Sequence, residues 1–151
     1  MDLSEYFDQT KGRGVLATAD AAGKVNSAVY ARPYFMDDDT VVFIMAERLT
    51  HENLQSNPWA TYLFMEEGEG YKGKRLYLKK VKEEQNDQFI SEICRKCDYS
   101  HYHIGTRYVV HFTVEKVLPL IGYHEKTYHQ LARGAFSLCP GSWLGMCHEG
   151  I

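Results

Sequence analysis

The segment from Glu47 to Pro58 contains the residues best suited to binding an anion. It is predicted to join a strand to a short helix, and the first turn of a helix exposes unpaired N–H groups at the positive end of its dipole. Such a turn can bind phosphate. Arg48 precedes it with a guanidinium suited to two parallel hydrogen bonds, and the Thr50 hydroxyl can donate to the same oxygens. The alternative is structural: Thr50 caps the helix, Glu52 complements its dipole and Arg48 lies on the surface.

The second predicted strand is another candidate for ligand binding, because Asn26 and Ser27 interrupt an otherwise apolar run. Ala28, Val29 and Ile44 could cover a flat ring while a few polar groups fix its orientation, as ligand pockets usually arrange. The alternative is that Asn26 and Ser27 mark the solvated face of an edge strand. Periodicity does not distinguish the two.

The four cysteines could form a third site. Cys94 and Cys97 have C-x-x-C spacing, and with Cys139 and Cys147 they could hold zinc in a tetrahedral site. Three histidines are alternative ligands: His101, His103 and His148. A redox dithiol is a further reading, but no thioredoxin-like pattern surrounds the pair. The favoured interpretation is four reduced thiols and no metal. No histidine is spaced to a second catalytic partner, so no catalytic residue is assigned.

The composition indicates one folded domain that must position these residues. The chain has 151 residues, of which 44% are hydrophobic and 25% charged, which excludes disordered and low-complexity classes. A net charge of −3 argues against nucleic-acid binding. No apolar run approaches the roughly 18 residues of a membrane helix, and the N-terminus lacks the features of a signal peptide. We therefore expect a cytoplasmic protein without a membrane partner.

The hydrophobic pattern predicts six strands and three helices. The helices are expected at residues 1–12, 50–55 and 83–97. The strands are expected at residues 14–20, 25–36, 40–46, 59–67, 71–81 and 107–118. A meander with only short helices favours a small antiparallel barrel, closed or split, over a parallel α/β sheet. Residues 123–151 show no sustained period and are expected to be an extension that packs on the barrel or on a partner subunit.

This order of elements, together with the run Asn53-Leu54-Gln55-Ser56-Asn57-Pro58, resembles the FMN-binding split-barrel family related to pyridoxamine 5′-phosphate oxidase. The resemblance covers residues 10–120 approximately. It implies a mainly β fold, a six-stranded antiparallel split β-barrel over residues 1–122. It also implies a homodimer with FMN at the subunit boundary. The implied function is that of an oxidoreductase acting on a small molecule, with NADH or NADPH as a candidate electron donor.

The resemblance also implies site residues. The flavin ring would lie against the second and third strands, and the phosphate near the following helix. The matching positions are Asn26, Ser27, Ala28, Val29, Ile44, Met45, Ala46, Arg48, Thr50, His51 and Asn53. Thr50 stands where many relatives carry Lys, so Arg48 and His51 would supply the positive charge instead. Ser27 stands where the oxidase carries Arg, so the oxidase's own substrate is not implied.

Two other functions stay open at this point. One is a binding or electron-carrier module that holds FMN, or haem, without turning over a substrate. The other is a metal-stabilised barrel that uses the cysteines and leaves the flavin site vacant. The oxidoreductase and the carrier module would both be yellow, whereas the metal-stabilised barrel would not. Bleaching by NADH or NADPH would then distinguish the oxidoreductase from the carrier.

Overall fold

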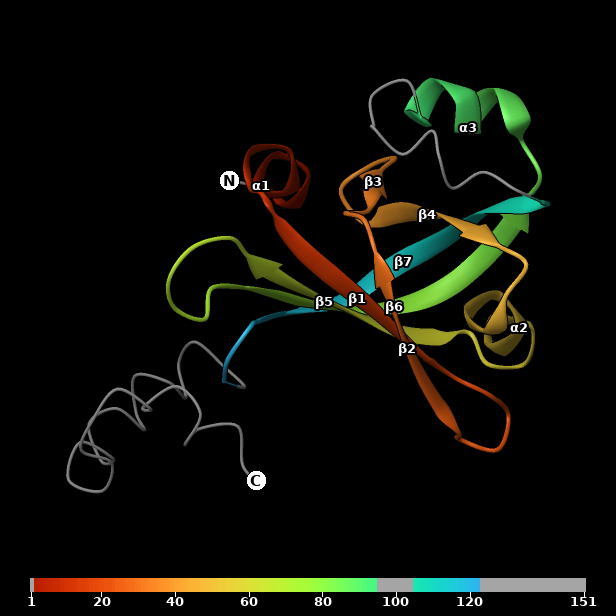
Figure 1. Ribbon diagram of the computed structural model, residues 1–151, viewed down its shortest axis with the longest axis horizontal. Coiled ribbons are helices and arrows are strands. Elements are labelled where there is room, and N and C mark those ends of the chain that lie inside the picture. The colour runs from red at the N-terminus through yellow and green to blue at the C-terminus, as the bar shows by residue number, and fades with distance from the viewer. Residues whose placement is uncertain (1, 95–104, 123–151) are drawn as a thin grey trace.

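The computed structural model describes residues 2–94 and 105–122, and this part of the chain forms seven strands and three short helices (Figure 1). The helices are α1 (Leu3–Gln9), α2 (Leu49–Ser56) and α3 (Asp87–Cys94). The strands are β1 (Gly12–Ala19), β2 (Val25–Tyr30), β3 (Tyr34–Phe35), β4 (Thr40–Ala46), β5 (Trp59–Glu66), β6 (Gly73–Glu84) and β7 (Arg107–Pro119). None of these helices is long and apolar enough to cross a bilayer.

The strands form one antiparallel sheet in the order β2-β1-β5-β6-β7-β4-β3. The sheet curls so that its two ends meet: the rings of Tyr30 on β2 and Phe43 on β4 lie 6.0 Å apart in an edge-to-face contact. No hydrogen-bonded ladder joins β2 to β4 within the described residues. The fold is therefore a split barrel, and the opening between β2 and β4 is called the split below.

Seven strands replace the six that were predicted, because the second predicted strand is divided at Pro33. Proline has no N–H to donate to a ladder. β2 ends at Tyr30, and the short β3 then pairs with Val41 and Val42 of β4. In the part of the chain that the structure describes, β2 is an end strand of the sheet, and no strand pairs with its outer edge.

The border between β6 and α3 also differs from the prediction. The charged residues around Glu83 and Glu84 were assigned to a helix, but they continue β6 and pair with β7. Two register shifts, at Tyr77/Leu78 and Lys80/Lys82, break the regular alternation of this strand. Bulges of this kind bend a strand. A curved strand with an irregular pattern of charges has no clear period of two, so its end was misassigned.

The barrel interior holds the main core, and α1 closes one end of it. Its buried members are Phe7, Leu16, Val41, Phe43, Met45, Leu54, Ala60, Tyr62, Phe64, Leu76, Leu78, Val110 and Phe112. Gly14 makes room for Tyr62, because a Cβ at that position would overlap the Tyr62 hydroxyl. A smaller cluster of Val42, Ile90 and Val109 attaches α3 to the outside of β4 and β7.

Candidate functional site

A cavity of about 500 Å³ occupies the split. This volume is within the range of pockets that hold small molecules and cofactors. Its walls come from β2, the loop after β2, β4, the first residues of α2, and single residues of β3, α3 and β7. β2 is an end strand, and β3 covers β4 only at Val41 and Val42. Both walls therefore present main-chain N–H and C=O groups that can bind the edge of a heterocycle.

Most of the predicted site residues line this cavity. They are Asn26, Ser27, Ala28, Val29, Ile44, Ala46, Arg48 and Thr50. Met45, His51 and Asn53 do not line it. Met45 alternates into the barrel core and is fully buried there, whereas the side chains of His51 and Asn53 reach other strands.

The N-terminus of α2 forms one end of the cavity. The N-cap residue is Arg48, whose extended backbone starts the helix without a side-chain cap. The capping interpretation of Thr50 is therefore wrong. Thr50 is buried one residue inside the helix, and its hydroxyl accepts a 3.4 Å hydrogen bond from Asn26 Nδ2. Within residues 2–94 and 105–122, Arg48 makes no ion pair. Arg48 and the first residues of α2 thus line the same end of the cavity.

Arg107 and Tyr30 belong to this end of the cavity, and neither was predicted. Arg107 begins β7 and is the Cα partner of Ala46, two residues before Arg48. Burial raises the pKa of Tyr30 above its ordinary value, and a hydrogen bond with Thr50 and the positive charge of Arg48 offset this only in part. Tyr30 therefore stays a protonated hydrogen-bond donor at neutral pH.

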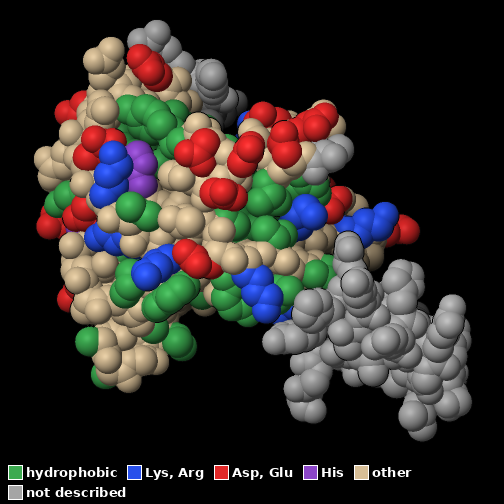
Figure 2. Space-filling model, turned by 180° about the vertical axis from the view of Figure 1, so that it is seen from behind, with side chains coloured by type: hydrophobic (Ala, Val, Ile, Leu, Met, Phe, Trp, Pro, Cys, Tyr) green, Lys and Arg blue, Asp and Glu red, His purple; other side chains and the backbone are tan. Residues whose placement is uncertain are grey.

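The charges that line the cavity are all of one sign. Arg32, Arg48 and Arg107 contribute to its walls, and no Asp or Glu does so among the described residues. The surface elsewhere is mixed: acidic and basic side chains intermingle over the face shown in Figure 2, and the whole chain has a net charge of −3. An acid-free cavity with several guanidinium groups concentrates anions.

The Asn-Leu-x-x-Asn-Pro run attaches α2 to the barrel. Asn53 is buried, and its Nδ2 donates a 3.1 Å hydrogen bond to Thr18 Oγ1 on β1. Leu54 enters the core. Asn57 ends the helix, and its Oδ1 accepts from the Trp59 N–H at the start of β5. These residues hold the helix that presents the anion-binding end, and their contribution to a ligand is indirect.

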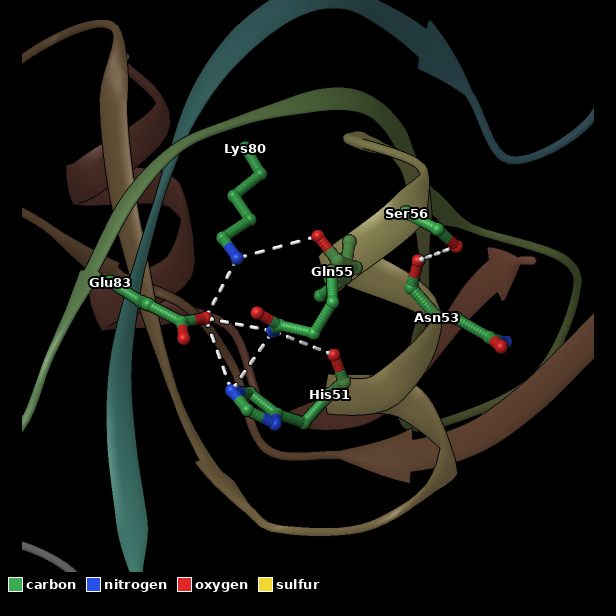
Figure 3. Close-up of polar contacts among 7 residues, drawn as sticks. His51, Asn53, Gln55, Ser56, Lys80 and Glu83 are labelled. Atoms are coloured by element: carbon green, nitrogen blue, oxygen red, sulfur yellow. Dashed lines mark hydrogen bonds and ion pairs between the residues drawn. The ribbon is translucent and has the colours of Figure 1, made fainter. Parts of the chain in front are cut away.

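A polar cluster on Glu83 attaches α2 to β6 (Figure 3). Glu83 Oε2 accepts hydrogen bonds from Lys80 Nζ at 2.7 Å and from Gln55 Nε2 at 3.1 Å. His51 Nε2 also lies 3.1 Å from this oxygen, and the His51 ring stacks on Tyr108 with centroids 4.0 Å apart. His51 therefore faces β6 and β7 and does not line the cavity, whereas Arg107, which was not predicted, does.

The Glu83 cluster makes stability depend on pH. Partial burial acts to raise the pKa of Glu83, but hydrogen bonds from Lys80 and Gln55 and the charges of His51 and Lys80 outweigh it, so this pKa is lowered. A lowered carboxylate pKa stabilises the folded state above the unfolded value of about 4.3, and this contribution disappears as the pH falls through the folded-state pKa.

We expect Glu83→Gln to lower the free energy of unfolding by about 1–2 kcal/mol at pH 7, and by much less once the pH is below the folded-state pKa of Glu83. Urea denaturation at the two pH values measures the difference. Glu67→Gln is the matched control, because the Glu67 carboxylate is exposed. A deficit that is equal at both pH values would contradict an ionic role for Glu83.

The proposed cysteine site is mostly outside the described residues. Cys97, Cys139 and Cys147 lie there, as do the histidines that were alternative ligands, and α3 ends at Cys94. Over residues 2–94 and 105–122, no three His, Cys, Asp or Glu side chains come together as a metal site.

No family model matches the sequence, and no curated protein does. Solved structures do match. An FMN-binding protein from Syntrophomonas wolfei aligns with a TM-score of 0.65 at 21% identity, over 80% of this chain and 85% of its own. The HupZ protein of Group A Streptococcus aligns with a TM-score of 0.59 at 18% identity, over 78% of this chain and 90% of its own. A provisionally assigned pyridoxamine 5′-phosphate oxidase from Lactobacillus delbrueckii aligns with a TM-score of 0.57 at 15% identity, over 76% of this chain and 88% of its own.

This chain has the split-barrel fold of flavin-binding proteins. The resemblance read from the sequence is thereby confirmed at the level of the fold, and the strand count is corrected from six to seven. Sequence identity to these structures is low, so the ligand has to be argued from the cavity itself.

Proposed function

We propose that the protein binds FMN in the split and transfers hydride or electrons between a reduced nicotinamide and a small molecule. The observation that carries this proposal is the cavity of about 500 Å³, which has arginines and a helix N-terminus at one end and two strand edges along its sides. A similar fold is found in a protein described as FMN-binding.

The residues present fit the chemistry of FMN. The phosphate would bind the first N–H groups of α2 together with Arg48 and Arg107, and Thr50 is close enough to Arg48 to add a hydroxyl. Ala28 and Ile44 offer apolar contact to a flat ring, and the main chains of β2 and β4 can bind its polar edge. FMN would supply the redox chemistry, and these residues would bind it, orient it and limit the access of water.

Reconstitution tests the proposal. The protein, incubated with excess FMN and then gel-filtered, should be yellow. Anaerobic NADH or NADPH should bleach the flavin bands, and oxygen should restore them. A colourless protein would overturn FMN binding. A yellow protein that neither nucleotide bleaches would favour the alternative, a carrier module that holds the flavin without turning over a substrate of its own.

We propose further that the protein is a homodimer. Several large apolar side chains are exposed on neighbouring strands of the outer sheet face: Val25, Val29, Trp59, Leu63, Met65 and Tyr77. The strand register places Val29 beside Val15, and Val15 beside Leu63, so the apolar residues adjoin one another. Sedimentation at micromolar concentration should give twice the chain mass, and Leu63→Glu should give a monomer. A wild-type monomer would contradict this proposal.

The cytoplasmic location stays a prediction.

A further inference from the structure

We infer that the cavity has a second anion-binding position, at Arg32, which receives a carboxylate or phosphate group of the small-molecule substrate. The inference rests on the proposed function, because it takes the α2 end of the cavity to be filled by the phosphate of FMN. It assigns the substrate to a chemical class, the small organic anions.

The count of charges is the first argument. A phosphate monoester carries about 1.5 to 2 negative charges at pH 7. Arg48 and Arg107 stand together at the α2 end through the pairing of Ala46 with Arg107, and the first N–H groups of α2 add the positive end of the helix dipole. Arg32 is a further cation of the cavity wall, and the exposed Asp8 carboxylate lies 3.4 Å from its Nη1. A cofactor phosphate therefore leaves one guanidinium of the cavity for another anion.

The position of Arg32 is the second argument. It follows β2 by two residues, and its Nη1 donates to the Phe7 carbonyl of α1. Asn26, near the other end of β2, contacts Thr50 of α2. α1 and α2 lie well apart in Figure 1. Tyr30, at the end of β2, reaches Thr50 with its hydroxyl, but the Arg32 guanidinium is held at α1 and so lies away from the first N–H groups of α2.

The geometry of the guanidinium is the third argument. Nη1 makes both of its contacts with described residues, the hydrogen bond to Phe7 and a 3.4 Å approach to Asp8 Oδ1. Nη2 and Nε are left to form the two parallel hydrogen bonds that a carboxylate accepts. The Asp8 side chain is 72% exposed, so it competes weakly with a ligand. The hydrogen bond to α1 fixes the orientation of the guanidinium before a ligand binds.

Oxalate is a suitable probe, with acetamide as its neutral counterpart. We expect FMN-loaded protein to bind oxalate, and not acetamide, in isothermal titration. Arg32→Gln should weaken oxalate binding about tenfold or more and leave FMN affinity within about threefold of wild type. The oxalate affinity of Arg32→Lys should lie between those of wild type and Arg32→Gln, because lysine keeps the charge but cannot form two parallel hydrogen bonds. Arg13→Gln, an exposed arginine on β1, is the matched control. Equal oxalate binding by wild type and Arg32→Gln would overturn the inference. A loss of FMN affinity as large as the loss of oxalate affinity would also overturn it, by placing Arg32 in the cofactor site.

A second arm separates this inference from the proposed function. Flavin-free protein with both Arg48→Ala and Arg107→Ala still contains Arg32 and should bind oxalate, and adding Arg32→Gln should weaken that binding about tenfold or more. If this holds while FMN does not bind, the anion position stands and the cofactor assignment falls. If oxalate binds neither the flavin-loaded nor the flavin-free protein, the anion position falls whatever the result for FMN.

Discussion

Replacing both Arg48 and Arg107 by alanine should weaken FMN binding by about 100-fold or more and leave riboflavin binding nearly unchanged. Both arginines line the α2 end of the cavity. A hydrogen bond to a charged group contributes about 1.5–3 kcal/mol, and a loss of 1.4 kcal/mol is tenfold in affinity. Riboflavin lacks the phosphate, so its affinity does not depend on these two arginines. Quenching of flavin fluorescence measures both dissociation constants in the same titration format.

Two further measurements make this result decisive. The double variant Arg13→Ala with Lys24→Ala removes the same charge from exposed positions and should not change either affinity. Equal losses for FMN and riboflavin would show that the cavity itself was damaged. Unchanged FMN affinity in the Arg48 and Arg107 variant would place the phosphate elsewhere and remove the main support for the site described above.

Replacing Phe7 by alanine should lower the free energy of unfolding by about 3–5 kcal/mol. Phe7 is 1% exposed, although it lies on a helix of only seven residues at the start of the chain. Its ring packs edge-to-face on Phe64 at 4.9 Å and stacks on Phe35 at 5.7 Å. The deletion would leave a cavity at the end of the barrel that these rings cannot fill. Urea denaturation monitored by circular dichroism gives the value.

Tyr71→Ala is the control for Phe7, because Tyr71 is 49% exposed in a turn. A surface substitution of this kind changes stability by about 0.5 kcal/mol or less. A loss below about 1 kcal/mol for Phe7→Ala would mean that α1 does not close the barrel in solution, and the anchoring of Arg32 by α1 would then fail as well.

The fold could be predicted where the pattern of residues is regular. β4 and β7 alternate or run apolar over their whole lengths, and their predicted bounds are nearly those observed. Prediction failed where one local feature overrides the pattern. Pro33 divides a strand that otherwise looks continuous, and the bulged end of β6 carries a run of charged residues that shows no period of two.

The site could be predicted only where it is local in sequence. Arg48 and Thr50 follow directly from a strand that leads into a helix, and the structure places both at the cavity. Arg107 and Arg32 reach the cavity through the β4–β7 pairing and the contact with α1. Those relations depend on tertiary structure that a single sequence does not reveal. His51 was misplaced for the same reason, because its partner Glu83 lies on a distant strand.

Among residues 2–94 and 105–122, no strand pairs with the outer edge of β2 or with the second half of β4 on the side of the split. Exposed strand edges recruit strands from other molecules and are a common origin of domain swapping and aggregation. A molecule lying in the split would cover both edges at once. A bound ligand would then prevent strand pairing between molecules. The ligand-free protein would be the form most prone to aggregate during expression and storage.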